Sequence, residues 1–575
     1  MKMFKNTTFR SGLSLFALLF ILGYYFFSFN KHSGWEQKNV IITDSKIYYS
    51  YLPATFIYKD LHFNYADSLN NKLGSHQVTG FKNEEGLTCQ KMSVGKSIMD
   101  IPFFLIAHAW AKMDSNYQAN GYDTIYHLLI GLAGLFYGFL ALVYVRKILR
   151  VQFPDYIVAI VILLIGCSTN LLFYSTYRSG MAHASGLFLV AFFIWNSMRY
   201  VDEGDVKALF QAMLALGLAM IVRPTNVLFG LFLLIYLFES GKSLSRLVED
   251  VKNRFAPHLL ALLAFLFPIV IQMSLWKYMS GNWIQYSYRD EGFFFSSPEI
   301  ISGLFSARNG VFLYAPILIF AFVGMFFSFK QKMKLSLIIP LVIFIYVIFS
   351  WWTWWYGGSF GSRSFIESYV IMALFLALFF ERISSNWHKN IQIIVFSILI
   401  ILSFQLTKKQ SYLSRYGVLH WDSMTYKAYW DLFPTGKYDD SFFDHLEAPD
   451  YQNSKKYGEE YIDFKVMDKH NSFSEVVKVS LEDYNVGDSI TVVCEIWDSN
   501  KIKFDKNTLV YLRLEHEGEV FLYDVKLAPK EKKRTYWNKL ILKIPVTEKT
   551  QGEIISLQYK YIGDSRCFYR LPKIE

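Results

Sequence analysis

The feature that most constrains this chain is a series of apolar runs, each long enough to cross a membrane as a helix. A helix needs about 20 mostly apolar residues to cross the hydrocarbon core of a bilayer. The first run, about residues 12–29, follows Lys2, Lys5 and Arg10 and lacks a small-x-small cleavage site, so we expect a signal anchor. Further spans are predicted near residues 122–145, 155–174, 180–197, 206–222, 224–239, 256–278, 311–329, 334–352, 365–381 and 390–407.

Basic residues alternate between the loops that join these runs. With the N-terminus in the cytoplasm, the inner loops hold clusters such as Arg146, Lys147 and Arg150, whereas the short outer loops hold single arginines. The positive-inside rule describes this distribution. This distribution of charge requires the short apolar segment 98–112 to be an interfacial or re-entrant helix. If that segment is counted as a span, the predicted membrane side of every later loop is reversed. We therefore predict about eleven spans within residues 1–407.

Composition agrees with a multi-pass membrane protein, and we expect it to lie in a bacterial inner (plasma) membrane. Hydrophobic residues make up 53% of the chain and charged residues only 18%, whereas a soluble protein is nearer to a quarter charged. A net charge of +10 would suggest a nucleic-acid partner in a soluble protein. Here the basic residues serve to orient the helices, so we expect membrane lipids and no nucleic acid as partners.

Residues 408–575 are predicted to form a soluble domain on the outer side. Its first part, SRYGVLHWDSMTYKAYWDLF, is typical of short amphipathic helices near a membrane. From about residue 472, alternating segments predict a β-sandwich or jelly roll: SITVVCEIW, LVYLRLEH, VFLYDVKL, KLILKIPV and IISLQYKYI. Cys494 and Cys567 both lie in this domain and would be free to pair if it is exported.

The predicted outer loops carry arginines among aromatic residues, glycines and prolines. These arginines oppose the positive-inside rule, so they need another explanation. A guanidinium offers a two-pronged donor that suits a phosphate, and flanking rings suit a polyprenyl chain or a sugar face. The alternative is that they pair with Asp290, Glu291, Glu367 or lipid headgroups. The arginines are Arg178, Arg223, Arg289, Arg308 and Arg363, and we weight Arg178 and Arg289 least.

The longest outer loop, about residues 30–121, carries further polar candidates. Asp44 lies just past the membrane edge and is followed by Tyr48 and Tyr49. Lys91 comes later in the same loop, and His183 stands at the mouth of a span. An acid at a membrane interface is usually not catalytic, but the arginines of the other outer loops strengthen the case for a catalytic role of Asp44. No dense carboxylate cluster or CxxC spacing suggests a metal, so we expect none.

In this order, the motifs resemble those of the GT-C-type integral membrane glycosyltransferases, in particular the branches like the dolichyl-phosphate-mannose protein mannosyltransferases and the aminoarabinose transferases. The resemblance covers most of residues 1–407. It rests on TDSKIYYSYLPATF, KMSVGKSIMDIPFF, MAH, the Arg223–Pro224 pair, LFSARNGVFLYAP and WWYGGSFGSR. The fold implied is an α-helical polytopic membrane protein, here with a soluble β-sandwich-like domain at its C-terminal end.

The resemblance implies transfer of a monosaccharide from a polyprenyl-phosphate carrier, with inversion, to a lipid, glycan or protein acceptor. Asp44 would then be the catalytic base. Arg223, Arg308 and Arg363, with Lys91, would hold the donor phosphate, and Tyr48, Tyr49, His183 and Glu367 would line the substrate cavity. The mannosyltransferases have an Asp-Glu pair where this chain has Asp44-Ser45, which weakens the case for a protein acceptor.

Two other functions stay open at this point. One is a transporter or flippase of a lipid-linked sugar, and the other is a polysaccharide polymerase or ligase that acts on the outer face. Transporters often show inverted repeats and ionisable residues at mid-membrane. This chain shows no repeat in its sequence, and its polar motifs lie at the outer edge, so the transferase is favoured.

The alternation of basic loops predicts that residues 408–575 are outside the cell. In a background without native cysteines, one cysteine introduced in this domain should react with an impermeant thiol reagent in intact spheroplasts. A cysteine in the 240–255 loop should react only after the membrane is made permeable. The reverse labelling pattern would overturn the predicted topology.

Overall fold

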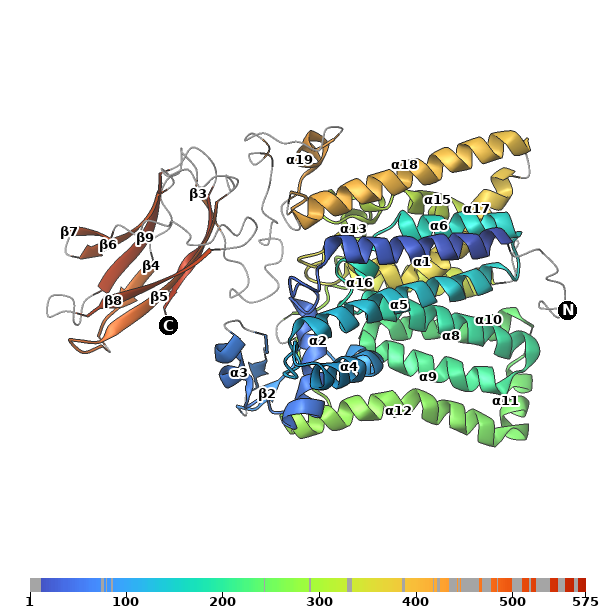
Figure 1. Ribbon diagram of the computed structural model, residues 1–575, viewed down its shortest axis with the longest axis horizontal. Coiled ribbons are helices and arrows are strands. Elements are labelled where there is room, and N and C mark those ends of the chain that lie inside the picture. The colour runs from blue at the N-terminus through green and yellow to red at the C-terminus, as the bar shows by residue number, and fades with distance from the viewer. Residues whose placement is uncertain are drawn as a thin grey trace. The chain divides into compact units, whose positions relative to one another are not determined.

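In the computed structural model, the described residues are 12–73, 77–78, 80–83, 86–241, 243–288, 291–327, 333–384, 388–416, 418–420, 424–433, 442, 445, 465–467, 477–482, 484–498, 509–516, 519–523, 538–546, 554–562 and 567–574. The chain divides into two compact units, Met1–Ser411 and Tyr412–Glu575. Figure 1 shows the helices and strands of both units.

The first unit is a bundle of apolar helices. Within its described residues, six helices are long and apolar enough to cross a membrane: Gly12–His32, Thr124–Leu149, His183–Glu203, Phe255–Ser280, Arg363–Ser384 and Asn390–Arg415. Five shorter apolar helices cover Asp155–Cys167, Val206–Val222, Pro224–Glu239, Ile317–Phe327 and Lys334–Phe349. Each predicted run overlaps one of these helices. The multi-pass membrane character is confirmed, whereas the count of about eleven spans stays a prediction because the shorter helices fall below the usual length.

The helices of the bundle run along one another (Figure 1). α8 (His183–Glu203) packs against α5 (Thr124–Leu149) and α9 (Val206–Val222), and α9 packs against α12 (Phe255–Ser280). The other helices of the bundle are α1 Gly12–His32, α6 Asp155–Cys167, α7 Leu171–Thr176, η2 Pro224–Phe229, α10 Gly230–Glu239, α11 Leu244–Asn253, α13 Ile300–Phe305, α14 Val311–Tyr314, α15 Ile317–Phe327, α16 Lys334–Phe349, η4 Arg363–Ser368, α17 Tyr369–Ser384 and α18 Lys389–Arg415.

The segment between α1 and α5 forms a small compact layer at one end of the bundle (Figure 1). It contains α2 Asp44–Pro53, the π-helical turn η1 Ala54–Tyr58, α3 Ala66–Leu73, the strands β1 Phe81–Lys82 and β2 Thr88–Cys89, and α4 Gly95–Met113. α4 covers the apolar segment that the sequence predicts as interfacial, and it is not among the helices that meet the requirements for a span. It contains a buried ion pair between Lys96 and Asp100.

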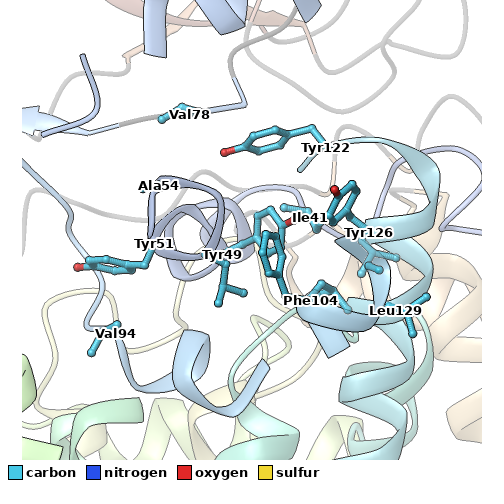
Figure 2. Packing of buried hydrophobic residues seen from close by; sticks show 14 of the residues in the cluster. Ile41, Tyr49, Tyr51, Ala54, Val78, Val94, Phe104, Tyr122, Tyr126 and Leu129 are labelled. Atoms are coloured by element: carbon cyan, nitrogen blue, oxygen red, sulfur yellow. The ribbon is translucent and has the colours of Figure 1, made fainter. Parts of the chain in front are cut away.

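Aromatic rings hold this layer onto the bundle. Tyr49 of α2 contacts Phe104 of α4 and Tyr122, with ring centroids 5.8 and 5.7 Å apart. Phe104 also lies 5.5 Å from the ring of Tyr126 on α5 (Figure 2). Because these rings come from three segments, the cluster fixes the position of α2, which begins at Asp44.

The second unit contains a short helix and two antiparallel sheets. The helix is α19, Tyr426–Asp431. The sheets have the strand orders β3-β10-β5-β8 and β4-β9-β6-β7. The strands are β3 Lys465–Met467, β4 Val477–Ser480, β5 Ser489–Asp498, β6 Leu509–His516, β7 Glu519–Tyr523, β8 Asn538–Pro545, β9 Ile554–Ile562 and β10 Cys567–Ile574. Five of them, β5 to β9, occur where the sequence predicts strands; a packed β-sandwich stays a prediction.

Strand register answers the question about Cys494 and Cys567. Cys567 of β10 lies opposite Asp498 of β5, so Cys494 is four residues further along that strand. At about 3.3 Å per residue this separates the two positions by roughly 13 Å. A disulfide needs Cα atoms within about 7 Å, so this register places the two Cα positions beyond that reach.

The aromatic cluster gives a test of the fold. We expect Phe104→Ala to destabilise the protein by about 3–5 kcal/mol, since it leaves a large cavity beneath α2. Leu105→Ala is the matched control, because Leu105 is the next residue and is 42% exposed. Thermal unfolding of the detergent-solubilised protein checks both variants. Equal unfolding temperatures for the two would contradict the packing described here.

Candidate active site

Asp44 is the first residue of α2, and the turn before it is tightly built. Thr43 has a positive φ of 52°, which is uncommon for a residue with a branched side chain. The hydroxyl of Ser45 donates to the carbonyl oxygen of Val40 at 2.9 Å. This turn packs on Gly180, where an added Cβ would lie 2.5 Å from the same carbonyl oxygen. The backbone therefore holds the start of α2 against the turn before α8.

The carboxylate of Asp44 forms an ion pair with Arg363. The Oδ2 atom lies 2.8 Å from Nη2 of Arg363, with the two side chains 30% and 15% exposed. Arg363 begins the short 3-10 helix η4, directly after the glycine-containing loop that ends at Ser362. Gly361 in that loop has a φ of +60°, and an added Cβ would lie 2.9 Å from Cβ of Tyr314. Glycine thus suits the turn that presents Arg363 to Asp44.

A second ion pair lies on the same 3-10 helix, four residues further on. The side chain of Glu367 is fully buried, and Nη1 of Arg223 lies 3.0 and 3.2 Å from its two oxygens. Arg223 caps the C-terminal end of α9 in extended conformation, and Pro224 after it begins η2. His183, the first residue of α8, places Nδ1 3.2 Å from Oε1 of Glu367 and 3.2 Å from Nη1 of Arg223.

Tyrosines connect the two ion pairs. Arg223 lies over the ring of Tyr356, 5.8 Å from its centroid. Burial raises the pKa of Tyr356 to about 12, although Arg223 and Arg363 oppose the rise. Tyr48 is buried on α2, and burial raises its pKa well above the usual value, with Tyr288, Arg223, Asp44 and Arg363 all acting on it. Both hydroxyls therefore stay protonated at neutral pH, and that of Tyr356 donates to the carbonyl oxygen of Ile348 at 2.8 Å.

Lys91 joins the group through a different contact. Its ammonium forms an ion pair with Glu291 and lies 5.2 Å from the centroid of the Tyr288 ring. Burial raises the pKa of Tyr288 to about 12; Arg223 and Arg363 lower it, while Asp44 and Glu291 raise it. The hydroxyl of Ser287 donates to the carbonyl oxygen of Lys91 at 2.6 Å. The segments around Lys91 and Tyr288 are thus packed together beside the two ion pairs.

The structure brings together most of the site residues predicted from the sequence. Asp44, Arg363, Arg223, Glu367 and His183 form the two ion pairs, which we call the paired-charge cluster. Tyr48 and Lys91 border this cluster. Its members come from α2, the end of α9, the start of α8 and η4.

Other predicted residues lie apart from the cluster. Tyr49 is buried in the aromatic layer, and its hydroxyl donates to the carbonyl oxygen of Gly121. Arg308 lies 5.4 Å from the centroid of the ring of Trp355, the residue before Tyr356. Among the described residues, Arg308 makes no contact with Asp44 or Glu367. Arg178 lies over the adjacent Tyr177 ring at 5.7 Å. Arg289 and Asp290 are outside the described residues.

Sequence reasoning missed Tyr288 and Tyr356 as members of the site. Both stand in loops with an arginine, within YSYRDEG and WWYGGSFGSR. Their chemistry gives no separate signal, since the chain has 39 tyrosines. Within the described ranges, no group of three or more His, Cys, Asp or Glu side chains is arranged to hold a metal ion.

No protein-family model matches this chain, and no curated protein matches its sequence. Among solved structures, the Archaeoglobus fulgidus oligosaccharyltransferase in its apo form matches with 12% identity and a TM-score of 0.42, over 93% of this chain and 77% of that one. The Archaeoglobus fulgidus oligosaccharyltransferase AglB, in complex with an inhibitory peptide and a dolichol-phosphate, matches with 12% identity and a TM-score of 0.38, over 80% and 68%.

The arabinosyltransferase EmbB from Mycobacterium smegmatis also matches, with 12% identity and a TM-score of 0.29, over 79% of this chain and 58% of that one. These neighbours are glycosyltransferases, as are the members of the family that the sequence resembles. At such TM-scores the likeness carries no argument about the substrate or the mechanism of this chain.

Proposed function

We propose that this chain is an integral membrane glycosyltransferase that moves a monosaccharide from a polyprenyl-phosphate carrier to a hydroxyl of a lipid, glycan or protein acceptor, with inversion. The observation that supports it is the Asp44–Arg363 pair, a partly exposed carboxylate held beside a guanidinium. A second guanidinium, that of Arg223, belongs to the same cluster. This combination provides a base for the acceptor and cations for the departing phosphate.

The proposed reaction needs a base for the acceptor hydroxyl and a group of cations that binds the phosphate. The acceptor oxygen attacks the anomeric carbon from the side opposite the phosphate, and Asp44 accepts the acceptor proton. The bond from that carbon to the phosphate oxygen breaks, and its electron pair leaves with the polyprenyl phosphate. A phosphate leaves without much help from an acid, but its charge needs stabilisation by preorganised cations. Arg363, Arg223 and Lys91 are the cations proposed for this role, and Arg308 is a more distant candidate.

The geometry of Asp44 is compatible with its part. Its ion pair uses Oδ2, and no partner of Oδ1 is found among the described residues. Oδ1 therefore remains an acceptor for a proton, and the bond to Arg363 fixes the plane of the carboxylate before the donor binds. Tyr48, Tyr288 and Tyr356 lie close to the cluster, and each combines an apolar ring with a polar hydroxyl, which supports binding of a sugar.

The cellular setting belongs to the same proposal. The reaction would take place at the outer face of a bacterial plasma membrane, with the unit Tyr412–Glu575 on that side. The Asp44, His183, Arg223 and Arg363 positions all lie at helix ends that the predicted topology places outside. Mass spectrometry of envelope glycans and lipids from a strain that lacks this chain would identify the product and provide the assay.

Asp44→Asn tests the base. The amide keeps the size of the side chain and removes its basicity, so we expect transfer from a labelled polyprenyl-phosphate sugar to fall by about 10²- to 10⁴-fold. Asp67→Asn is the matched control, since Asp67 is an exposed acid on α3 in the same region. Thermal unfolding of both variants separates a loss of the base from a loss of the fold. Wild-type transfer by Asp44→Asn would place the base elsewhere.

Arg363→Lys tests the phosphate cradle. Lysine keeps the charge and loses the two-pronged donor, so we expect the KM for the donor to rise about tenfold or more. Arg199→Lys is the control, because Arg199 pairs with Glu203 and Asp205 at the other end of α8. A fall in kcat with unchanged KM would instead indicate that Arg363 acts only in the transition state, on the departing phosphate or through the orientation of Asp44.

A further inference from the structure

Glu367 stands out because it is a carboxylate with no exposed surface in a site that is proposed to bind an anion. Its side chain is 0% exposed, compared with 30% for Asp44. A buried carboxylate close to a phosphate would repel it unless the carboxylate is neutralised. Arg223 and His183 provide its partners, so the role of Glu367 depends on what it does to them. The inference below rests on the proposed function and deepens it.

The contacts of Arg223 use only one of its three guanidinium nitrogens. Nη1 lies 3.0 and 3.2 Å from the oxygens of Glu367 and 3.2 Å from Nδ1 of His183. No hydrogen bond from Nε or Nη2 to another described residue is found. These two nitrogens form the other edge of the planar group, and their N–H bonds are parallel enough to bind two oxygens of one phosphate. Anchoring Nη1 therefore leaves the two-pronged edge available for a ligand.

The contacts of His183 restrict the movement of the ion pair between Arg223 and Glu367. Its ring packs against Tyr174 in a T-shaped arrangement with centroids 5.3 Å apart. The hydroxyl of Tyr174 is 3.1 Å from that of Ser359 and accepts from the backbone N–H of Phe360 at 3.0 Å. These bonds connect His183 to the loop that leads into η4. Arg223, His183 and Glu367 are thus tied to α9, α8 and η4 by a continuous set of contacts.

The packing of α8 leaves space for Glu367 and little more. Gly186 lies one helical turn after His183, and a Cβ added there would lie 2.9 Å from Cγ and 2.9 Å from Oε1 of Glu367. A side chain at this position would push the carboxylate away from Arg223. The absence of a side chain at Gly186 therefore allows the carboxylate of Glu367 to be buried beside Arg223.

We infer that Glu367 clamps Nη1 of Arg223, that Nδ1–H of His183 donates to Oε1 of Glu367, and that these two positioning residues thereby direct the Nε–Nη2 edge of Arg223 to the phosphate of the polyprenyl carrier. Glu367 does not take part as a base, because it has no exposed surface and both oxygens are engaged. The competing explanation is that the ion pair between Glu367 and Arg223 only holds the end of α9 against η4. The two explanations differ in how the effect of Glu367 depends on Arg223.

The test measures the affinity of the full chain in detergent for undecaprenyl phosphate, with undecaprenol as the lipid that lacks the phosphate. The ratio of the two affinities is the phosphate preference. In the wild-type background, Glu367→Gln should reduce this preference about 10- to 100-fold, which corresponds to losing an aligned charged hydrogen bond. In an Arg223→Ala background, the same change should leave the preference unchanged or improve it, because it removes an unpaired negative charge.

A further variant, with its control, keeps the test decisive if Glu367→Gln folds poorly. Gly186→Ala retains all three polar groups and displaces the carboxylate, so it should also lower the phosphate preference. Gly23→Ala is its control, because a Cβ at Gly23 meets nothing within 4 Å. Glu381→Gln is the control for the charge change, since Glu381 lies on α17, which follows η4 directly in the chain.

The outcomes separate the inference from the proposed function. If Glu367→Gln lowers the phosphate preference equally with and without Arg223, the positioning role is overturned and only the structural role of Glu367 remains. An unchanged preference in both Glu367→Gln and Gly186→Ala would overturn it as well. If Arg223→Ala itself keeps the full phosphate preference, Arg223 is not part of the donor site and both the inference and that part of the proposed function fail.

Discussion

The site depends on the pairing of charges that are buried at the ends of membrane helices. An isolated guanidinium or carboxylate there would lose several kcal/mol of hydration, so each must meet a partner. Arg363 meets Asp44, and Arg223 meets Glu367 and His183. The partners come from segments that are far apart in sequence. Forming the pairs therefore fixes α2, α8, α9 and η4 relative to one another, in addition to their apolar packing.

Local backbone geometry brings these charges to the same place. Arg223 is extended because Pro224 follows it, and a residue before proline is disfavoured in helical conformation. Thr43 and Gly361 both have positive φ, and each precedes one member of the Asp44–Arg363 pair by one or two residues. Gly180 and Gly186 supply close approaches for the Asp44 turn and for Glu367. The site is thus built where helices stop, since only there is the backbone free to turn.

The fold and the site differ in how far the sequence predicts them. Apolar runs predict helices well, because the bilayer imposes length and composition on each run separately. Strand alternation likewise predicts β5 to β9, but not β10, which pairs with β3 and β5 across the domain. Asp44, Arg223 and Arg363 are identifiable because a charge in that setting requires an explanation. Which carboxylate each arginine meets is not predictable, because it depends on how the helix ends meet in space. Tyr288 and Tyr356 carry no such signal in a tyrosine-rich chain.

The two ion pairs differ in a way that matters for the proposed transfer. The cluster with Lys91 and Glu291 contains three basic and three acidic side chains, so a phosphate must compete with carboxylates for the cations. Glu367 is fully buried and cannot separate from Arg223 without remaining as an unpaired charge. Asp44 is 30% exposed and can be solvated or meet an acceptor hydroxyl instead. Under the proposed function, Arg363 is therefore the cation that exchanges its carboxylate for the phosphate. That exchange would release the Asp44 base when the donor arrives, while Arg223 stays in place.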